Sequence, residues 1–118
     1  MKKYMAIYTG TAAGRAEWEK LSAEERTSRQ AAGMRAWREW GTVHREAIVD
    51  GGGPLGKTKR VSRQGVSDVR NNMAAYVIVQ AESQEAAARI FENHPHFSIF
   101  PGDGVEIMEC LPVPGEAR

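Results

Sequence analysis

The sequence Ala74-Ala75-Tyr76-Val77-Ile78-Val79-Gln80-Ala81 decides the fold of this chain. Its valine, isoleucine and tyrosine residues predict a β-strand, because such side chains pack well on a pleated surface. A strand with one face in water alternates apolar and polar residues, whereas this run is apolar on both faces. It therefore predicts a strand whose two faces are both covered.

Three further strands are predicted around this run, at residues 4–8, 55–62 and 105–111. In the last of them, Val105 and Ile107 fall on one face and Met108 and Cys110 on the other, since successive side chains in a strand alternate. This strand is therefore also apolar on both faces. Residues 63–72 contain glycine, serine and asparagine, and they predict a connecting loop or a hairpin.

The longest helix is predicted from Ser22 to about Asp50. Ser22 and Glu25 have the spacing of a capping box, in which each side chain accepts a hydrogen bond from the backbone amide of the other residue. The apolar residues that follow recur at steps of three and four, as on a helix with one buried face. They are Met34, Trp37, Trp40, Gly41, His44, Ala47 and Ile48. The glycines and proline of residues 51–54 are expected to end this helix.

A second helix is predicted after the strand at 74–81. Ser83 is a suitable N-cap residue, and Glu85 lies in the first turn, where the helix dipole stabilises negative charge. Pro95 is expected to stop the helix, because the residue before a proline is disfavoured in the helical region.

The elements follow in the order strand, helix, strand, strand, helix, strand. With right-handed crossovers, this order gives an α+β fold of the ferredoxin-like βαββαβ type, with a four-stranded antiparallel sheet and two helices on one face. The other face of the sheet would then be open, although the strands are apolar on that side. A second copy of the chain is the simplest cover, so the pattern predicts a homodimer with its sheets packed face to face.

Length and composition restrict the class of protein. The 118 residues predict one domain, 1–118, with a core at about residues 3–113 and a short C-terminal tail at 114–118. Sixteen basic and fifteen acidic residues give a net charge of +1, which provides no overall attraction to nucleic acid or to a membrane surface. No segment has the roughly twenty apolar residues of a membrane span, and the N-terminal run is too short for a signal peptide. Cys110 is the only cysteine and permits no internal disulfide, so we expect a cytoplasmic protein.

Several short motifs are spread over about residues 3–113: Lys3-Tyr4-Met5, Gly53-Pro54-Leu55, Ala75-Tyr76-Val77-Ile78-Val79, Ala81-Glu82-Ser83, His94-Pro95, Val105-Glu106-Ile107 and Pro112. In their order and spacing they resemble the YCII-related (DGPF-type) domain family. The resemblance implies a dimeric α+β barrel built on a ferredoxin-like subunit. Most members have no assigned activity. A few act on small aromatic or chlorinated molecules, with a histidine from the first helix and an aspartate just before the proline that follows the second helix.

The chain departs from this family at both of those positions. His94 stands where the family has the aspartate, and the helix histidine would fall near residues 35–37, which contain no histidine. The loop that often reads Asp-Gly-Pro-Phe is Ser67-Asp68-Val69-Arg70 here. The family's pair of functional residues therefore cannot be carried over to this chain.

His94 and His96 are the candidate catalytic residues. The carboxyl end of a helix favours a charged imidazolium, and a neutral imidazole can act as a general base near neutral pH. The alternative is structural: Asn93 and His94 cap the helix, and His96 packs in the turn. A further alternative is a metal site with Asp103 or Glu106 as the third ligand. We expect neither a metal nor a cofactor.

Five other residues are candidates for substrate binding: Trp37, Trp40, His44, Asp68 and Asn72. The tryptophans are expected in the core or in a cavity wall. His44 continues their stripe, where a histidine is more often a hydrogen-bonded core residue than a ligand. Tryptophan and histidine on a helix beside a barrel cavity also resemble the haem-degrading and cofactor-free monooxygenases of this fold, which is an analogy of fold alone. Asp68 and Asn72 are expected at the cavity rim, although turn formation explains them equally well.

Lysines and arginines gather between residues 57 and 70. Such a run is usually solvated; it could attract an anionic substrate, but without interleaved aromatic residues it does not predict a nucleic-acid partner. The sequence as a whole predicts a homodimer that binds a small aromatic or anionic molecule between helix and sheet, with cofactor-free acid/base catalysis as the chemical hypothesis. The competing hypothesis is a non-catalytic accessory or binding domain with structural histidines.

Overall fold

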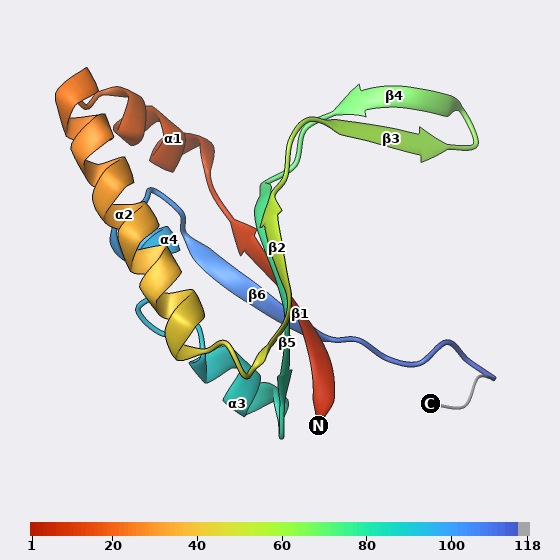
Figure 1. Ribbon diagram of the computed structural model, residues 1–118. Coiled ribbons are helices and arrows are strands. Elements are labelled where there is room, and N and C mark those ends of the chain that lie inside the picture. Colours follow the sequence, from red (N-terminus) through yellow and green to blue (C-terminus); the bar gives the residue numbers. More distant parts are fainter. Residues whose placement is uncertain (116–118) are drawn as a thin grey trace.

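The computed structural model describes residues 1–115 (Figure 1). The strands are β1 Lys2–Thr9, β2 Ile48–Pro54, β3 Thr58–Ser62, β4 Gly65–Val69, β5 Met73–Ala81 and β6 Gly104–Glu109. The helices are α1 Ala12–Glu19, α2 Ala23–Val43, α3 Gln84–Arg89 and α4 Pro95–Ser98. Of the expected C-terminal tail at 114–118, residues 116–118 lie outside the described part of the chain.

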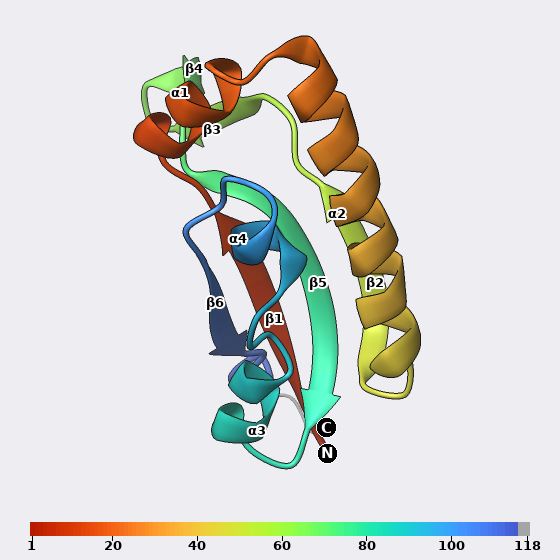
Figure 2. The same ribbon diagram turned by 90° about the vertical axis from the view of Figure 1, so that its left-hand side faces the viewer.

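The main sheet has the strand order β2-β5-β1-β6, and each neighbouring pair of strands is antiparallel. The two strands at its centre, β1 and β5, place Tyr4 opposite Val79 and Tyr8 opposite Ala75. The helices lie on one side of this sheet (Figures 1 and 2). α2 and α3 are the two predicted helices, and α1 and α4 are short additions. The predicted ferredoxin-like α+β fold is therefore confirmed.

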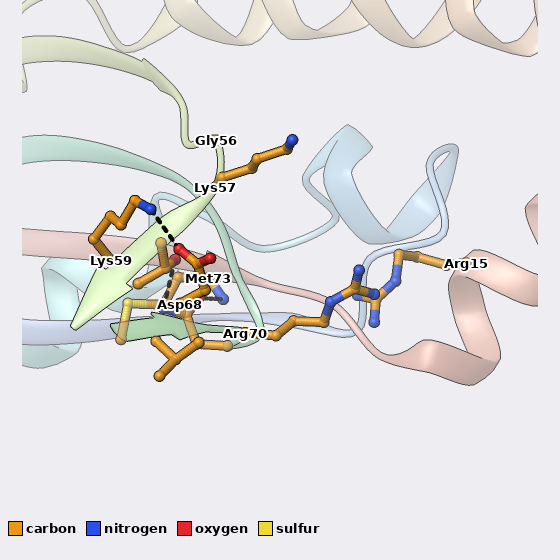
Figure 3. Close-up of a pocket in the computed structure, with 10 residues that line it drawn as sticks. Arg15, Gly56, Lys57, Lys59, Asp68, Arg70 and Met73 are labelled. Atoms are coloured by element: carbon orange, nitrogen blue, oxygen red, sulfur yellow. Dashed lines mark hydrogen bonds and ion pairs between the residues drawn. The ribbon is translucent and has the colours of Figure 1, made fainter. Parts of the chain in front are cut away.

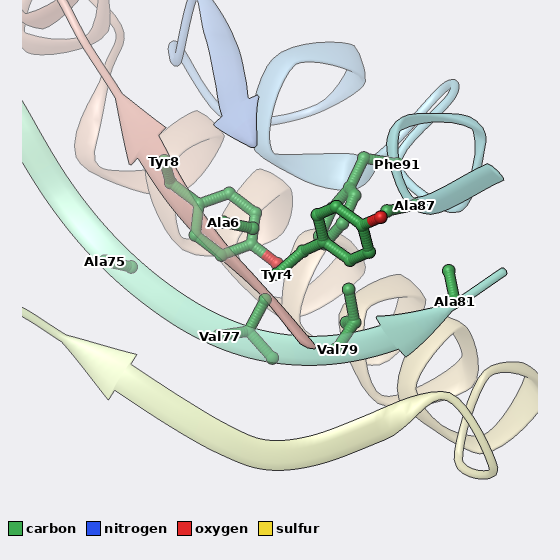
Figure 4. Close-up of a cluster of buried hydrophobic side chains, with 9 residues drawn as sticks. All are labelled: Tyr4, Ala6, Tyr8, Ala75, Val77, Val79, Ala81, Ala87 and Phe91. Atoms are coloured by element: carbon green, nitrogen blue, oxygen red, sulfur yellow. The ribbon is translucent and has the colours of Figure 1, made fainter. Parts of the chain in front are cut away.

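The hydrophobic core lies between the sheet and the helices (Figure 4). Tyr4, Tyr8 and Val77 point toward the helices from β1 and β5, and each is at most 2% exposed. Ala87 in α3 and Phe91 just after it close the cluster from the helix side. Because aromatic side chains bury large apolar areas, this cluster holds the helices on the sheet.

The other face of the sheet carries apolar side chains that no helix covers. We call these five residues the apolar sheet face: Met5, Ile7, Tyr76, Ile78 and Met108. They alternate with the core residues along β1, β5 and β6, and they are half-buried or exposed, Met108 to 44%. Met5 lies opposite both Ile78 and Met108, and Ile7 lies opposite Tyr76, so the side chains are neighbours across three strands.

β3 and β4 form a separate two-stranded hairpin. It projects from the main sheet on the side away from the helices (Figure 1). Val61 and Val66 are paired across this hairpin and are 77% and 69% exposed. The hairpin that was one alternative for residues 63–72 is thus present. Residues 55–62 were predicted to form the second strand of the main sheet, and this was wrong, because β3 pairs with β4 in the hairpin instead.

The second strand of the main sheet is β2, and this corrects the predicted end of the long helix. The capping box of Ser22 and Glu25 does begin α2, with both hydrogen bonds present. The helix ends at Val43, however, and His44 is its C-cap residue. Residues 48–54, assigned to the helix and its terminating glycines, pair with β5.

The glycines of residues 51–53 let β2 follow the edge of β5 with two irregularities in register. Gly52 has a φ of +61°, and a Cβ at this position would overlap the carbonyl oxygen of Tyr76. The side chain of Asp50 accepts a hydrogen bond from the Gly52 amide at 2.9 Å, which stabilises the local turn. A glycine run inside an extended segment is typical of a bulged edge strand. The sequence alone indicated that these glycines end a helix, and it did not predict the bulge.

Replacing Gly52 by alanine is expected to destabilise the fold. The left-handed backbone of a non-glycine residue costs about 1–3 kcal/mol, and the overlap with the Tyr76 carbonyl adds to that cost. The matched control is Gly51→Ala, since a Cβ at Gly51 meets nothing within 4 Å. Urea unfolding of both variants measures the difference, and equal stabilities would show that β2 does not need the bulge.

The second predicted helix is also shorter than expected. Ser83 caps α3 as predicted, accepting a hydrogen bond from the Ala86 amide, but α3 ends at Arg89. Pro95 begins the next helix, α4, instead of stopping α3. Proline fits the first position of a helix because the missing N–H would have no partner there. Within residues 1–115, none of the helices combines the length and the apolar character that crossing a membrane requires.

Candidate functional site

The chain reverses between α3 and α4, and His94 is placed by this turn. Asn93 has a φ of +58°, a backbone conformation that asparagine tolerates better than most residues. His94 then acts as the N-cap of α4: its Nδ1 accepts a hydrogen bond from the His96 amide at 3.0 Å. The turn that carries His94 and His96 is therefore built by a helix start, where the histidine side chain replaces the usual serine or aspartate.

His94 is fully buried, with both ring nitrogens engaged. Because Nδ1 accepts the backbone hydrogen bond, the neutral ring carries its proton on Nε2, which lies 3.2 Å from the Tyr8 hydroxyl and donates to it. Burial lowers the pKa of His94 to about 4, and the charges of His96 and His44 act in the same direction. Burial also raises the pKa of the Tyr8 hydroxyl. This pair is neutral at physiological pH.

Aromatic rings from α2 and β1 surround His94. Its ring centroid lies 4.5 Å from that of Trp37, 4.6 Å from that of Trp40 and 4.9 Å from that of Tyr8. The indole of Trp40 donates a hydrogen bond to the Ile90 carbonyl at 2.9 Å. α2 is thus held on the sheet by its two tryptophans, which pack around a neutral histidine.

His96 is 7% exposed and is oriented by the backbone of β1. Its Nε2 lies 2.6 Å from the Thr9 carbonyl oxygen, which can only accept, so Nε2 carries a proton and Nδ1 holds the lone pair in the neutral ring. Within residues 1–115, Nδ1 makes no hydrogen bond, and no buried side-chain polar atom lacks a partner. Of the four ring nitrogens of His94 and His96, Nδ1 of His96 is therefore the one that remains accessible to a ligand.

A cavity of about 370 Å³ lies beside His96. Its walls come from the start of α1, the segment before β5 and the loop after α4: Gly10, Thr11, Arg15, Leu55, Asn71, Asn72, Met73, Ala74, His96, Phe100, Pro101 and Gly102. We call this the His96 cavity. Its volume falls in the range of about 300–1,000 Å³ that small-molecule sites have.

Glycines allow the wall of this cavity to pack closely. A Cβ at Gly102 would overlap the His96 ring, one at Gly33 in α2 would overlap Phe100, and one at Gly14 in α1 would meet the Pro101 carbonyl. The loop after α4 can therefore lie directly against α1, α2 and the imidazole. These three glycines were not identified from sequence, because their role depends on contacts between distant segments.

The structure brings some of the predicted site residues together and separates others. Trp37, Trp40 and His94 form the aromatic cluster, and the ring of His44 lies 5.3 Å from that of Trp40 at the end of α2. Asn72 and His96 both line the same cavity, the His96 cavity.

Asp68 lies in the hairpin, where it forms an exposed ion pair with Lys59 at 2.6 Å. It lines a second, adjoining cavity and not the His96 cavity. Arg15, which lines both cavities, was not identified as a candidate. Its helix, α1, is not one of the two helices predicted from the sequence, so nothing in the local sequence pointed to Arg15.

The alternative of a metal site is not supported by a ligand cluster. No group of three histidine, cysteine, aspartate or glutamate side chains that could hold a metal ion occurs in the part of the chain described here. Asp103, one of the two suggested third ligands, accepts a hydrogen bond from the Thr9 hydroxyl at 2.7 Å.

Comparisons with known proteins agree with the fold. No family model matches the chain, and the search of curated proteins gave no match. Among solved structures, the chain is similar to 5-chloro-2-hydroxyhydroquinone dehydrochlorinase (TftG) from Burkholderia phenoliruptrix AC1100 in complex with 2,5-dihydroxybenzoquinone. The TM-score is 0.50 and the sequence identity 16%, over 92% of this chain and 91% of that chain. At this identity the similarity shows the fold alone: the chain has a ferredoxin-like α+β fold.

Proposed function

We propose that this protein binds a small aromatic or anionic molecule in the His96 cavity. The observation that carries the proposal is the state of His96: Nε2 is held on the Thr9 carbonyl, which leaves Nδ1 as an accessible acceptor beside a cavity of suitable size. Phe100 and Met73 supply apolar surface, and Asn72 and Arg15 supply polar groups. A pocket with apolar walls and a few polar groups is typical of small-molecule sites.

The chemistry that this arrangement favours is proton transfer by His96 without a cofactor. An imidazole whose one nitrogen is fixed by a carbonyl has a defined tautomer, and its other nitrogen can accept a proton from a bound phenol or acid. His94 is a positioning residue in this proposal. Its nitrogens are used by Tyr8 and by the His96 amide, so it fixes the start of α4 from which the His96 side chain extends.

Membership of the YCII-related family is part of the same proposal. It is supported by the motifs along the chain and by the fold shared with TftG, whose solved structure contains 2,5-dihydroxybenzoquinone. Neither of the family's two functional residues is present in this chain. Trp37 lies near the position of the family's histidine, His94 stands at the position of its aspartate, and the two rings are packed edge to face. We therefore expect His96, and not His94, to contact the ligand.

We also propose that two copies pair through the apolar sheet face. Five neighbouring apolar side chains on a face that no helix covers favour burial against a second surface. A second copy offers the same apolar surface, as a two-fold interface requires. The β3–β4 hairpin extends to the same side, so its exposed valines could contact the second copy (Figure 1).

A non-catalytic binding domain is the second candidate function. It is favoured by the fact that three of the four ring nitrogens of His94 and His96 are hydrogen-bonded within the protein. Ligand binding alone is compatible with both candidates. Product formation from a bound compound, lost in a His96→Gln variant that still binds that compound, would separate catalysis from binding.

Binding is tested by thermal shift with benzoate, catechol and 2,5-dihydroxybenzoquinone. A compound that binds the folded state raises the melting temperature with its concentration. We expect a shift for the unmodified protein, and a shift reduced at least about fivefold for His96→Leu, because the hydrogen bond to Nδ1 is lost. His44→Leu is the control outside the cavity and should keep the shift. A shift that survives His96→Leu would place the ligand elsewhere, and no shift with any of the three compounds would contradict the proposal.

A further inference from the structure

A second cavity of about 740 Å³ adjoins the His96 cavity at the base of the hairpin. Its lining includes four basic side chains, those of Arg15, Lys57, Lys59 and Arg70, and one acidic side chain, that of Asp68. Asp68 is already paired with Lys59. Within residues 1–115, Arg15, Lys57 and Arg70 form no ion pair within 4 Å, so the cavity carries an excess of positive charge.

Arg15 and Arg70 extend toward each other from α1 and from the end of β4 (Figure 3). Two guanidinium groups that face one another repel, and nothing in the described part of the chain neutralises either of them. An oxyanion between them would remove the repulsion and accept hydrogen bonds from both planar groups. Arginine is suited to this role because its N–H groups match the geometry of a carboxylate.

Arg15 also lines the His96 cavity, and Asn71 and Met73 are shared by the two cavities. A molecule with its ring beside His96 can therefore direct a charged substituent past Arg15 toward Arg70. We infer that the ligand class is a small aromatic carboxylate, held by Arg15 and Arg70 through its carboxylate while its ring occupies the His96 cavity. This inference rests on the proposed function and adds the charge of the ligand and the residues that select it.

The consequence is that the hairpin takes part in binding. Arg70 directly follows β4, whereas Arg15 belongs to α1 on the other side of the cavity. A carboxylate held by both residues connects the hairpin base to the helix layer. The ligand should therefore be selected by charge at this junction and by ring shape in the His96 cavity.

Isothermal titration with benzoate and with its neutral analogue benzamide tests the inference. The unmodified protein should bind benzoate about tenfold more tightly than benzamide, and Arg15→Gln or Arg70→Gln should each abolish most of that preference, since each removes a charge-assisted hydrogen bond. Arg63→Gln, in the turn of the hairpin, removes the same charge away from both cavities and should leave the preference intact. The benzoate affinity should fall with added salt, as expected for an exposed charge interaction.

The remaining outcomes separate this inference from the proposed function. If both compounds bind equally well and both depend on His96, the cavity assignment stands and the carboxylate site is wrong. If the arginine variants weaken benzoate and benzamide to the same extent, the arginines only maintain the structure and the inference is wrong. Inorganic phosphate that binds as tightly as benzoate would show a general anion site, which contradicts a selective carboxylate site. If neither benzoate nor benzamide binds, the inference is wrong, whereas the proposed function fails only when catechol and 2,5-dihydroxybenzoquinone also give no thermal shift.

Discussion

An Ile78→Asp variant is expected to be monomeric under conditions in which the unmodified protein is a dimer. Ile78 belongs to the apolar sheet face. It lies opposite Met5 on β1, and Met5 lies opposite Met108 on its other side. In the proposed dimer its side chain would be buried against the second copy, and an unpaired charge buried there costs several kcal/mol, so the dissociation constant should rise by at least about 100-fold. Light scattering coupled to size-exclusion chromatography measures the mass of each form.

Two further variants keep this test independent of folding. Met108→Asp places the same charge on a neighbouring strand, where the residue is more exposed, and should also give monomers. Met34→Asp changes an exposed methionine of α2, 43% accessible, on the helix side of the molecule and should leave the dimer intact. Circular dichroism confirms that each variant is folded. Finding the unmodified protein to be a monomer at micromolar concentration, or finding Ile78→Asp to be a folded dimer, would refute the sheet-face dimer.

The stability of this protein is expected to fall between about pH 6.5 and pH 4, with a contribution from His94 on the order of 3 kcal/mol. Burial lowers the pKa of His94 from 6.5 to about 4 in the folded state. Between these values the unfolded chain binds a proton at this residue and the folded chain does not, so lowering the pH favours the unfolded state. Above pH 6.5 His94 is neutral in both states, and the full stability is present. Below pH 4 His94 is protonated in both states, so the loss of stability is complete and does not increase further.

The variant that isolates this effect is His94→Asn. Asparagine does not titrate and is a good N-cap, so it can still accept the His96 amide, although it fills less of the aromatic cluster. At pH 7 the variant should be less stable by about 2–4 kcal/mol, because a cavity forms among Trp37, Trp40 and Tyr8. That difference should shrink as the pH falls from 6.5 to 4.

Urea unfolding at several pH values gives the free energies of both proteins. His44→Asn is the control: its ring lies at the end of α2, and removing it should leave most of the slope in place. A difference between the unmodified protein and His94→Asn that stays constant over this pH range would mean that His94 is not held neutral in the folded state.

The sequence by itself determined the class of fold and the faces of the central strands. Hydrophobic alternation is a local property, so the run at 74–81 and the strand at 105–111 could be assigned to two faces before any contact was known. The caps of Ser22 and Ser83 were equally local, because each depends on residues three positions away. These assignments led to the ferredoxin-like order of elements.

The tertiary structure decided the second strand and the geometry of the candidate site. Residues 48–54 look like the end of a helix because glycine and proline end helices, but here the open edge of β5 offers hydrogen bonds, and the glycines accommodate the bulged pairing. The different environments of His94 and His96 depend on Tyr8 and Thr9, more than eighty positions earlier in the chain. The approach of Arg15 to Arg70 depends on packing between α1 and the hairpin base. Such contacts join segments that share no sequence pattern, so only the folded chain brings these groups together.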